Sequence, residues 1–66
     1  MRTYMYTYDI HMVDGGIKLR AGAGIVEARS IFDACGKIQY EKDLLLRNDP
    51  EISYVDVIEI VKEKDR

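Results

Sequence analysis

Residues 4–16 read YMYTYDIHMVDGG, and this stretch decides which fold the chain can adopt. Apolar side chains occupy every second position of it, at Tyr4, Tyr6, Tyr8, Ile10 and Met12. Successive side chains of an extended chain point to opposite faces, so this spacing predicts a β-strand with one apolar face over about residues 3–13. Asp14-Gly15-Gly16 then predicts a hairpin turn, because glycine accepts the positive φ angles that tight turns require.

A second strand is predicted over residues 17–28, and the turn sets its register. A two-residue turn at Asp14-Gly15 would pair Met12 with Ile17. That parity places four further side chains on the tyrosine face: Ile17, Leu19, Ala21 and Ala23. The opposite face is then polar, with His11 pairing across the hairpin with Lys18 or Arg20. Gly22-Ala23-Gly24 indicates either a bulge or a close backbone approach, and a bulge would turn Val26 and Ala28 toward the core.

A helix is predicted to begin after Ser30 and to end at Asn48-Asp49-Pro50. Ser30 is a favourable N-cap, and Asp33 three residues later resembles the partner of a capping box. Proline blocks continuation, and Asn48 suits the left-handed position that ends many helices. The predicted buried stripe is Ile31, Ala34, Cys35, Ile38 and Leu45. Asp33 with Lys37, and Asp43 with Arg47, have the i,i+4 spacing of helical ion pairs. Gly36 costs helix stability, which suggests close packing of a strand.

A third strand is predicted over residues 52–61, with apolar residues on both faces. Ile52, Tyr54, Ile58 and Ile60 fall on one side, and Val55, Val57 and Val61 on the other. The expected fold class is α+β, a two-layer β-β-α-β unit with one helix on one face of a mainly antiparallel three-stranded sheet of order 2-1-3. Residues 1–61 would form a single domain, followed by a charged tail over residues 62–66. Because one helix covers only one face, a second molecule is expected on the other.

Size and charge exclude several functional classes. A chain of 66 residues buries about 60% of its unfolded surface, so its stability is marginal without additional support. One cysteine and one histidine cannot form an internal disulfide or an ordinary zinc site, which leaves self-association as the expected support. The net charge of −2 provides no field that attracts nucleic acid. No apolar run reaches the ~20 residues of a membrane span, so we expect a cytoplasmic protein without membrane contact.

The sequence contains no recognisable catalytic, cofactor or metal site. Cys35 lies on the predicted apolar stripe and is expected to be a buried, inert thiol. The only histidine, His11, lies elsewhere, on the polar side of the first strand. Gly22-Ala23-Gly24 lacks the third glycine of a dinucleotide fingerprint and continues as strand. We therefore expect a protein that is not an enzyme.

The tyrosine row has an alternative interpretation as a nucleic-acid surface. Aromatic side chains on an open sheet stack on bases, each contributing about 1–3 kcal/mol. The residues of such a surface would be Tyr4, Tyr6 and Tyr8 with Arg2, Lys18 and Arg20. However, the row continues into Ile10 and Met12, which require burial, and this continuity favours a core.

The strand-to-helix junction over residues 24–34, GIVEARSIFDA, is of a kind common in small α+β proteins. With the preceding hairpin, the chain resembles the short accessory proteins of bacteriophages and prophages, some of which inhibit host defence by binding a host protein. The resemblance concerns the general layout. It implies an inhibitor or regulator without naming a target.

The sequence therefore predicts a non-catalytic protein-binding module that occludes the surface of a host protein, most simply as a homodimer. The predicted self-association surface is the helix-free sheet face, with Met5, Val26, Val55 and Val57; pairing of edge strands is the other geometry. Two alternatives remain open at this point. One is the single-stranded nucleic-acid binder described above, and the other is a sponge that captures a small signalling molecule between protomers.

Overall fold

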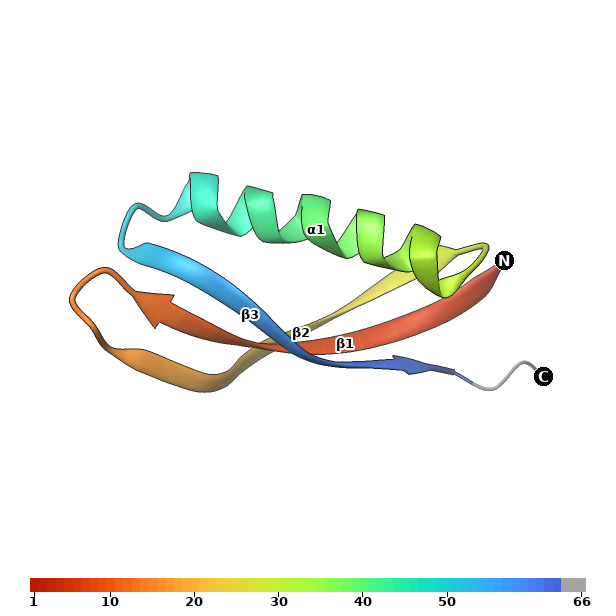
Figure 1. Ribbon diagram of the computed structural model, residues 1–66, viewed down its shortest axis with the longest axis horizontal. Coiled ribbons are helices and arrows are strands. Elements are labelled where there is room, and N and C mark those ends of the chain that lie inside the picture. The colour runs from red at the N-terminus through yellow and green to blue at the C-terminus, as the bar shows by residue number, and fades with distance from the viewer. Residues whose placement is uncertain (64–66) are drawn as a thin grey trace.

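The computed structural model describes residues 1–63 and contains three strands and one helix. In chain order these are β1 (Arg2–Met12), β2 (Ile17–Ala28), α1 (Ile31–Asn48) and β3 (Ile52–Lys62). The strands form one antiparallel sheet of order β2-β1-β3, and α1 lies across one face of it (Figure 1). The predicted α+β fold, with the tyrosine strand at its centre, is confirmed. Of the predicted charged tail over residues 62–66, Lys62 ends β3, and residues 64–66 lie outside the described part of the chain.

The hairpin turn is one residue longer than predicted, which reverses the faces of β2. The Met12 amide donates to the Gly16 carbonyl at 2.7 Å and the Gly15 amide donates to the Met12 carbonyl at 3.1 Å, with Gly15 at φ 94°. This three-residue loop pairs His11 with Ile17, whereas a two-residue turn would pair Met12 with Ile17. A slip of one residue moves every side chain of a strand to the other face.

Because of this change of register, the β2 side chains that lie on the tyrosine face differ from those predicted. Tyr4, Tyr6 and Tyr8 face Val26, Gly24 and Gly22 across the β1–β2 pair. Four residues that were predicted to share the tyrosine face lie on the opposite side or in the bulge: Ile17, Leu19, Ala21 and Ala23. The residues that the helix covers on β2 are instead Val26, 8% exposed, and Ala28, 0% exposed.

A β-bulge does occur in β2, but it precedes the glycines. The β1–β2 register shifts between Tyr8 and Ile10, so that three residues of β2, Leu19 to Ala21, lie opposite Asp9. At its centre Arg20 has φ 48°, in the left-handed region, and its amide donates to the Asp9 carboxylate at 2.7 Å. A side chain other than glycine is unfavourable in that region, and the Asp9 hydrogen bond holds the backbone there.

We expect Arg20→Gly to raise the free energy of unfolding by about 0.5–1 kcal/mol, because glycine adopts φ 48° without the steric cost of a Cβ atom. Asp9→Ala should lower it by a similar amount, since it removes the acceptor of the Arg20 amide. Urea denaturation followed by circular dichroism measures both changes. Equal stability of the Arg20→Gly variant and the wild type would show that the bulge is not strained.

The core forms between the tyrosine face and α1. Tyr4 is 3% exposed, Tyr6 6% and Ile38 2%, and they cluster with Val26, Ala28 and Ala34. Val55 on β3 is fully buried, and Tyr8, Val57 and Ile60 pack at the margin of the cluster. The interpretation of the tyrosine row as a core is therefore confirmed for Tyr4 and Tyr6.

Two glycines of β2 lie directly beneath tyrosine rings of β1. A Cβ atom at Gly24 would lie 2.4 Å from the Tyr6 ring, and one at Gly22 would lie 2.3 Å from the Tyr8 hydroxyl. The rings thus occupy the space that side chains of β2 would otherwise fill. This close approach, rather than a bulge, explains Gly22 and Gly24.

The helix begins as predicted but presents a different face to the core. The Ser30 hydroxyl accepts a hydrogen bond from the Asp33 amide at 3.2 Å, and Lys37 forms an ion pair with Asp33 at 3.8 Å. Asp43 accepts from Gln39 instead of pairing with Arg47, and Asp49 in extended conformation is the C-cap. Within α1 only Ala34 and Ile38 are buried.

Three predictions about the helix are wrong. Ile31, which was predicted to be buried, is 42% exposed. Cys35 is exposed, because it lies one residue beyond the stripe that Ala34 and Ile38 define. Gly36 packs against nothing, since a Cβ atom there would have no neighbour within 4 Å. Its place in the sequence is not explained by packing within the chain.

Candidate functional site

The structure places three of the four residues of the predicted self-association surface under the helix. Val26 and Val55 are buried, and Val57 packs against the core, so the predicted placement of these valines on the helix-free face is wrong. The reason is the register: Val55 and Val57 pair with Ile10 and Tyr8 on the tyrosine face. Met5 alone lies on the helix-free face, 41% exposed.

The residues of the alternative nucleic-acid surface are not brought together. Tyr4 and Tyr6 are covered by α1, and Tyr8 is half-buried with its ring centroid 6.1 Å from that of Tyr6. Arg2 pairs with Ala28 at one end of the sheet, whereas Lys18 pairs with Ile10 near the hairpin. At ~3.3 Å per residue, these two ends of β1 are about 25 Å apart. The arrangement offers no row of exposed rings flanked by cations.

Burial raises the pKa of the Tyr6 hydroxyl above its ordinary value, and the nearby Glu41 carboxylate and Tyr8 hydroxyl raise it further. Each of these effects disfavours the phenolate form. Tyr6 therefore stays neutral throughout the physiological pH range and acts as a core side chain.

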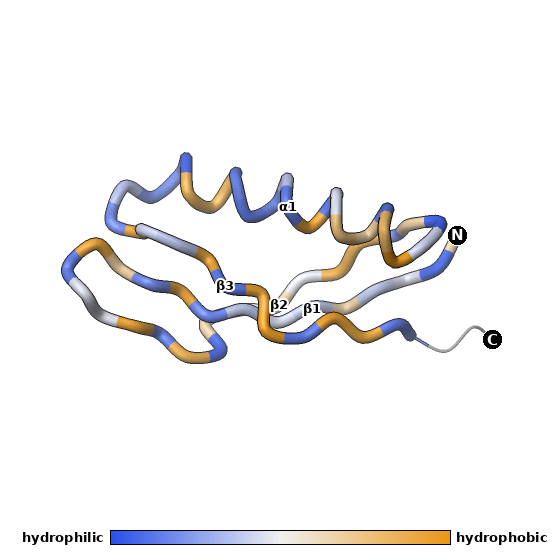
Figure 2. The backbone as a smooth tube through the Cα atoms, viewed as in Figure 1, coloured by the Kyte–Doolittle hydropathy of each residue, from blue (hydrophilic) through white to orange (hydrophobic). Residues whose placement is uncertain are grey.

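The face of the sheet away from α1, which we call the open face, carries an apolar row across all three strands. Met5 on β1 pairs with Ile25 on β2 and with Val61 on β3, so the three side chains lie side by side. Their exposed fractions are 41%, 62% and 46%. Beside the row is a shallow cavity of about 250 Å³, lined mainly by apolar atoms, to which Met5, Ala23 and Val61 contribute. Figure 2 shows hydrophobic stretches in β2 and β3 as well as in α1.

Acidic side chains border this row. Residues paired with odd-numbered positions of β1 share the open face, and their carboxylates are Asp9, Glu27, Asp56 and Glu59. These pairings include no lysine or arginine, although the Lys42 ammonium of α1 lies 5.2 Å from the centre of the Tyr54 ring, near the hairpin end of the sheet. His11 contacts Tyr54 there, with ring centroids 5.7 Å apart, rather than Lys18 or Arg20 as predicted. The open face is thus an apolar row bordered by acidic side chains.

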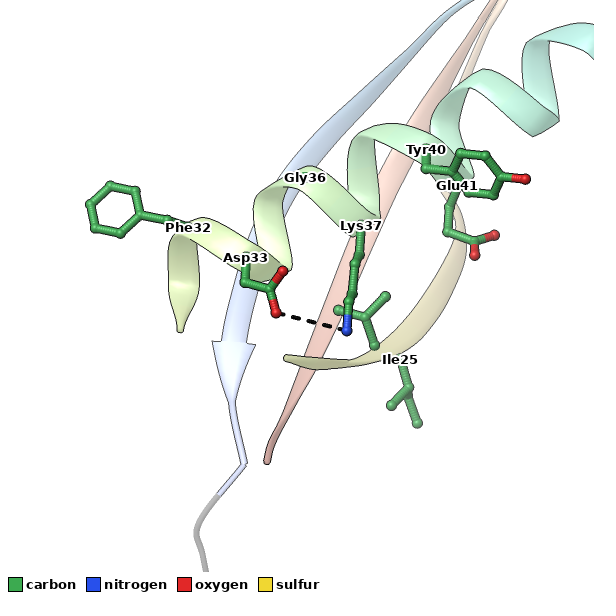
Figure 3. A pocket seen from close by; sticks show the side chains of 8 residues that line it. Ile25, Phe32, Asp33, Gly36, Lys37, Tyr40 and Glu41 are labelled. Carbon is green, nitrogen blue, oxygen red and sulfur yellow. Dashed lines mark ion pairs between the residues drawn. The ribbon is translucent and has the colours of Figure 1, made fainter. Parts of the chain in front are cut away.

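A second exposed region lies on the helix. A groove of about 570 Å³ runs between α1 and the edge strand β2, with Ile25 on the strand side and Phe32, Gly36 and Tyr40 on the helix side (Figure 3). Phe32 is 85% exposed and Tyr40 is 62% exposed. The Lys37 ammonium crosses the groove, pairing with Asp33 and donating to the Glu27 carbonyl of β2.

The cysteine and the histidine of the chain lie on different elements. Cys35 is exposed on α1, and His11 contacts Tyr54 on the open face of the sheet. Among residues 1–63, no three His, Cys, Asp or Glu side chains gather in a way that would hold a metal ion. In the same part of the chain, no helix has both the length and the apolar character needed to cross a bilayer.

The sequence analysis did not single out Ile25, Phe32 and Tyr40 as exposed apolar residues, and it grouped Val61, which is exposed, with Val55 and Val57, which are not. A signal for Ile25 was present, because a hairpin with three loop residues instead of two places it on the same face as Met5, whereas Val61 reaches that face through the separate β1–β3 register. For the helix, the four-residue spacing of Phe32, Gly36 and Tyr40 was visible and indicates one shared face. Comparisons of the chain with protein-family models, with curated proteins and with solved structures find no match.

Proposed function

We propose that this chain is a non-catalytic, self-associating protein-binding module that occludes a surface of a partner protein, and that the open face makes this contact. The observation that carries the proposal is the exposed row of Ile25, Met5 and Val61 across the sheet. Exposed apolar rows with a polar border are typical of protein interaction sites. The action as an inhibitor or regulator in the cytoplasm, and a phage origin, rest on the resemblance in layout described above.

The charges on the open face specify the chemistry of the partner. Carboxylates border the row without a compensating lysine or arginine among the open-face residues described above. A surface with an apolar anchor and a basic border is complementary to this pattern, and opposite charges also accelerate association. A phosphate backbone would be repelled, which disfavours the nucleic-acid alternative.

The test is retention of a partner from the native host on immobilised protein, compared between the wild type and two variants. We expect Met5→Lys to weaken binding at least tenfold, about 1.4 kcal/mol, because it inserts a cation at the centre of the row. Leu19→Ser is the matched control, since it removes a 76% exposed side chain near the hairpin. Equal retention by all three proteins would overturn the open face as the contact surface.

The same purified protein distinguishes protein binding from the two alternatives, nucleic-acid binding and capture of a small signalling molecule. A labelled single-stranded oligonucleotide at low salt should show no change in fluorescence anisotropy. A salt-sensitive increase would favour nucleic-acid binding. A small molecule that co-purifies with the protein and is detected by native mass spectrometry would favour capture of a signalling molecule.

A further inference from the structure

The two edge strands of the sheet, β2 and β3, differ in how well they are protected from pairing with another strand. β2 pairs with β1 in unbroken register over residues 22–28, and Glu27 is the one charged residue in that stretch. β3 has two register shifts along its pairing with β1, and it carries Asp56 and Glu59. Bulges and charged side chains discourage strand addition, whereas a regular, apolar edge allows it. The edge that remains available is therefore that of β2.

The backbone groups at the free edge of β2 can be identified from the register. The Glu63 amide donates to the Thr3 carbonyl at 2.9 Å, so the backbone groups of Thr3 are directed toward β3. The β2 residue opposite Thr3 is Glu27, which therefore directs its amide and carbonyl away from β1. The Lys37 ammonium donates to this carbonyl from outside the sheet, as that direction requires.

The same alternation directs the amides and carbonyls of Ala23 and Ile25 to the free edge. A second β2 strand could pair there antiparallel, with a two-fold axis at Gly24. Ala23 of each protomer then lies opposite Ile25 of the other. The two residues exchange their amide and carbonyl hydrogen bonds, and symmetry repeats the exchange on the other side of the axis.

Two features make β2 complementary to itself in this register. The Tyr6 ring lies over Gly24, so a side chain directly across from Gly24 would crowd the ring, whereas a second Gly24 has none. The charges also match, because Glu27 of each protomer lies opposite Ala21 of the other and next to its Arg20. Both charged residues belong to β2, so the two-fold axis places one such pair at each end of the interface.

We propose that a second copy of this chain pairs with the free edge of β2, antiparallel about a two-fold axis at Gly24, so that the two sheets become one. This inference rests on the self-association in the proposed function and assigns it a surface. The groove between α1 and β2 borders the same edge (Figure 3). The second copy adds a strand and a helix on that side, and it covers part of Ile25, which is 62% exposed.

The dimer combines the open faces of its two protomers. Neighbouring antiparallel strands in one sheet are related by an axis perpendicular to that sheet, so both helices lie on one side and both open faces on the other. The row of Ile25, Met5 and Val61 thus continues into the same row of the second copy. The partner protein meets one surface of twice the width.

Proline substitution tests the edge by sedimentation equilibrium at micromolar concentration. Ala23→Pro removes an amide that points away from β1, so the chain keeps its own ladder while the interface loses a hydrogen bond on each side of the axis. We expect dimerisation to weaken at least tenfold with an unchanged circular dichroism spectrum. Ala23→Ser, which retains the amide at the same exposed position, is the matched control and should dimerise like the wild type. Equal dimerisation of Ala23→Pro and Ala23→Ser would overturn the β2 interface.

Disulfide formation between two different variants tests the register independently. In a Cys35→Ser background, Ala23→Cys protein mixed with Ile25→Cys protein should form a mixed disulfide in oxidised glutathione, because the two positions lie about 5.5 Å apart at Cα. Neither protein alone should cross-link, since identical positions are about 9 Å apart across the axis, beyond the ~7 Å limit. A disulfide between two Ile25→Cys chains, and none in the mixture, would overturn the axis at Gly24.

The remaining outcomes separate this inference from the proposed function. A dimer that survives Ala23→Pro and forms no mixed disulfide would overturn the β2 pairing and leave self-association standing at another surface. A wild-type chain that sediments at the monomer mass of 7.6 kDa would overturn self-association as well, while partner binding by the open face, which Met5→Lys tests, would stand. If Ala23→Pro but not Ala23→Ser then failed to retain the host partner, a strand of that partner would occupy the edge in place of a second copy.

Discussion

Gly24→Ala should lower the free energy of unfolding by about 1–3 kcal/mol, which is the usual cost of overpacking a core. The new methyl group would lie 2.4 Å from the Tyr6 ring, and Tyr6 is only 6% exposed and cannot swing into solvent. Tyr6 must therefore leave its position against α1, or the strands must separate. For a chain of this length total stability is about 3–10 kcal/mol, so the loss is a substantial part of it. Urea denaturation followed by tyrosine fluorescence measures the change.

Two other glycines serve as controls for Gly24→Ala. Gly22→Ala should cost less, because the Tyr8 hydroxyl that it meets belongs to a half-buried side chain that can move. Gly36→Ala should stabilise the folded monomer by about 0.5–1 kcal/mol, since it meets nothing and improves helix propensity. A Gly24→Ala variant as stable as the wild type would show that the ring does not lie over the strand.

Ile38→Ala should lower the free energy of unfolding by about 2–4 kcal/mol. Ile38 is 2% exposed and is, with Ala34, one of the two buried residues of α1. Its removal leaves a cavity between the helix and the tyrosine face that the neighbouring side chains cannot fill completely. Thermal unfolding followed by circular dichroism should show a transition that is shifted to much lower temperature or lost.

The matched control is Ile31→Ala on the same helix. Ile31 is 42% exposed, so the same truncation there should cost about 1 kcal/mol or less. Equal losses at both positions would contradict the packing of α1 against the sheet. Repeating the measurement at several protein concentrations separates folding from self-association.

Much of the fold was predictable from local patterns. Alternation of Tyr4, Tyr6 and Tyr8 predicted the central strand, and the Ser30 hydroxyl caps the helix where the sequence indicated. Ile38 and Ala34 were correctly assigned to the buried stripe, whereas Cys35 was not. Local patterns succeed here because strand alternation, N-capping and the effect of proline all depend on neighbouring residues.

The candidate site was less predictable, because it depends on the register between strands. A single additional loop residue, Val13, exchanged the faces of β2, and a register shift beside Tyr8 changed the alternation of β3. Val26, Val55 and Val57 consequently entered the core, and Ile25 and Val61 joined Met5 on the outside. No pattern within a single strand reports such a shift.

The sequence by itself determined the elements, their order and the role of the tyrosine row as the underside of the helix. Those features follow from side-chain periodicity and from backbone preferences at Ser30, Pro50 and Gly15. Only the tertiary structure decided which faces remain exposed and why Gly22 and Gly24 are present. Gly22 and Gly24 lie beneath the tyrosine rings, while Gly36 faces outward with nothing above it. The difference is physical: secondary structure depends on contacts close in sequence, whereas exposure depends on pairings between strands and helix that are far apart in the chain.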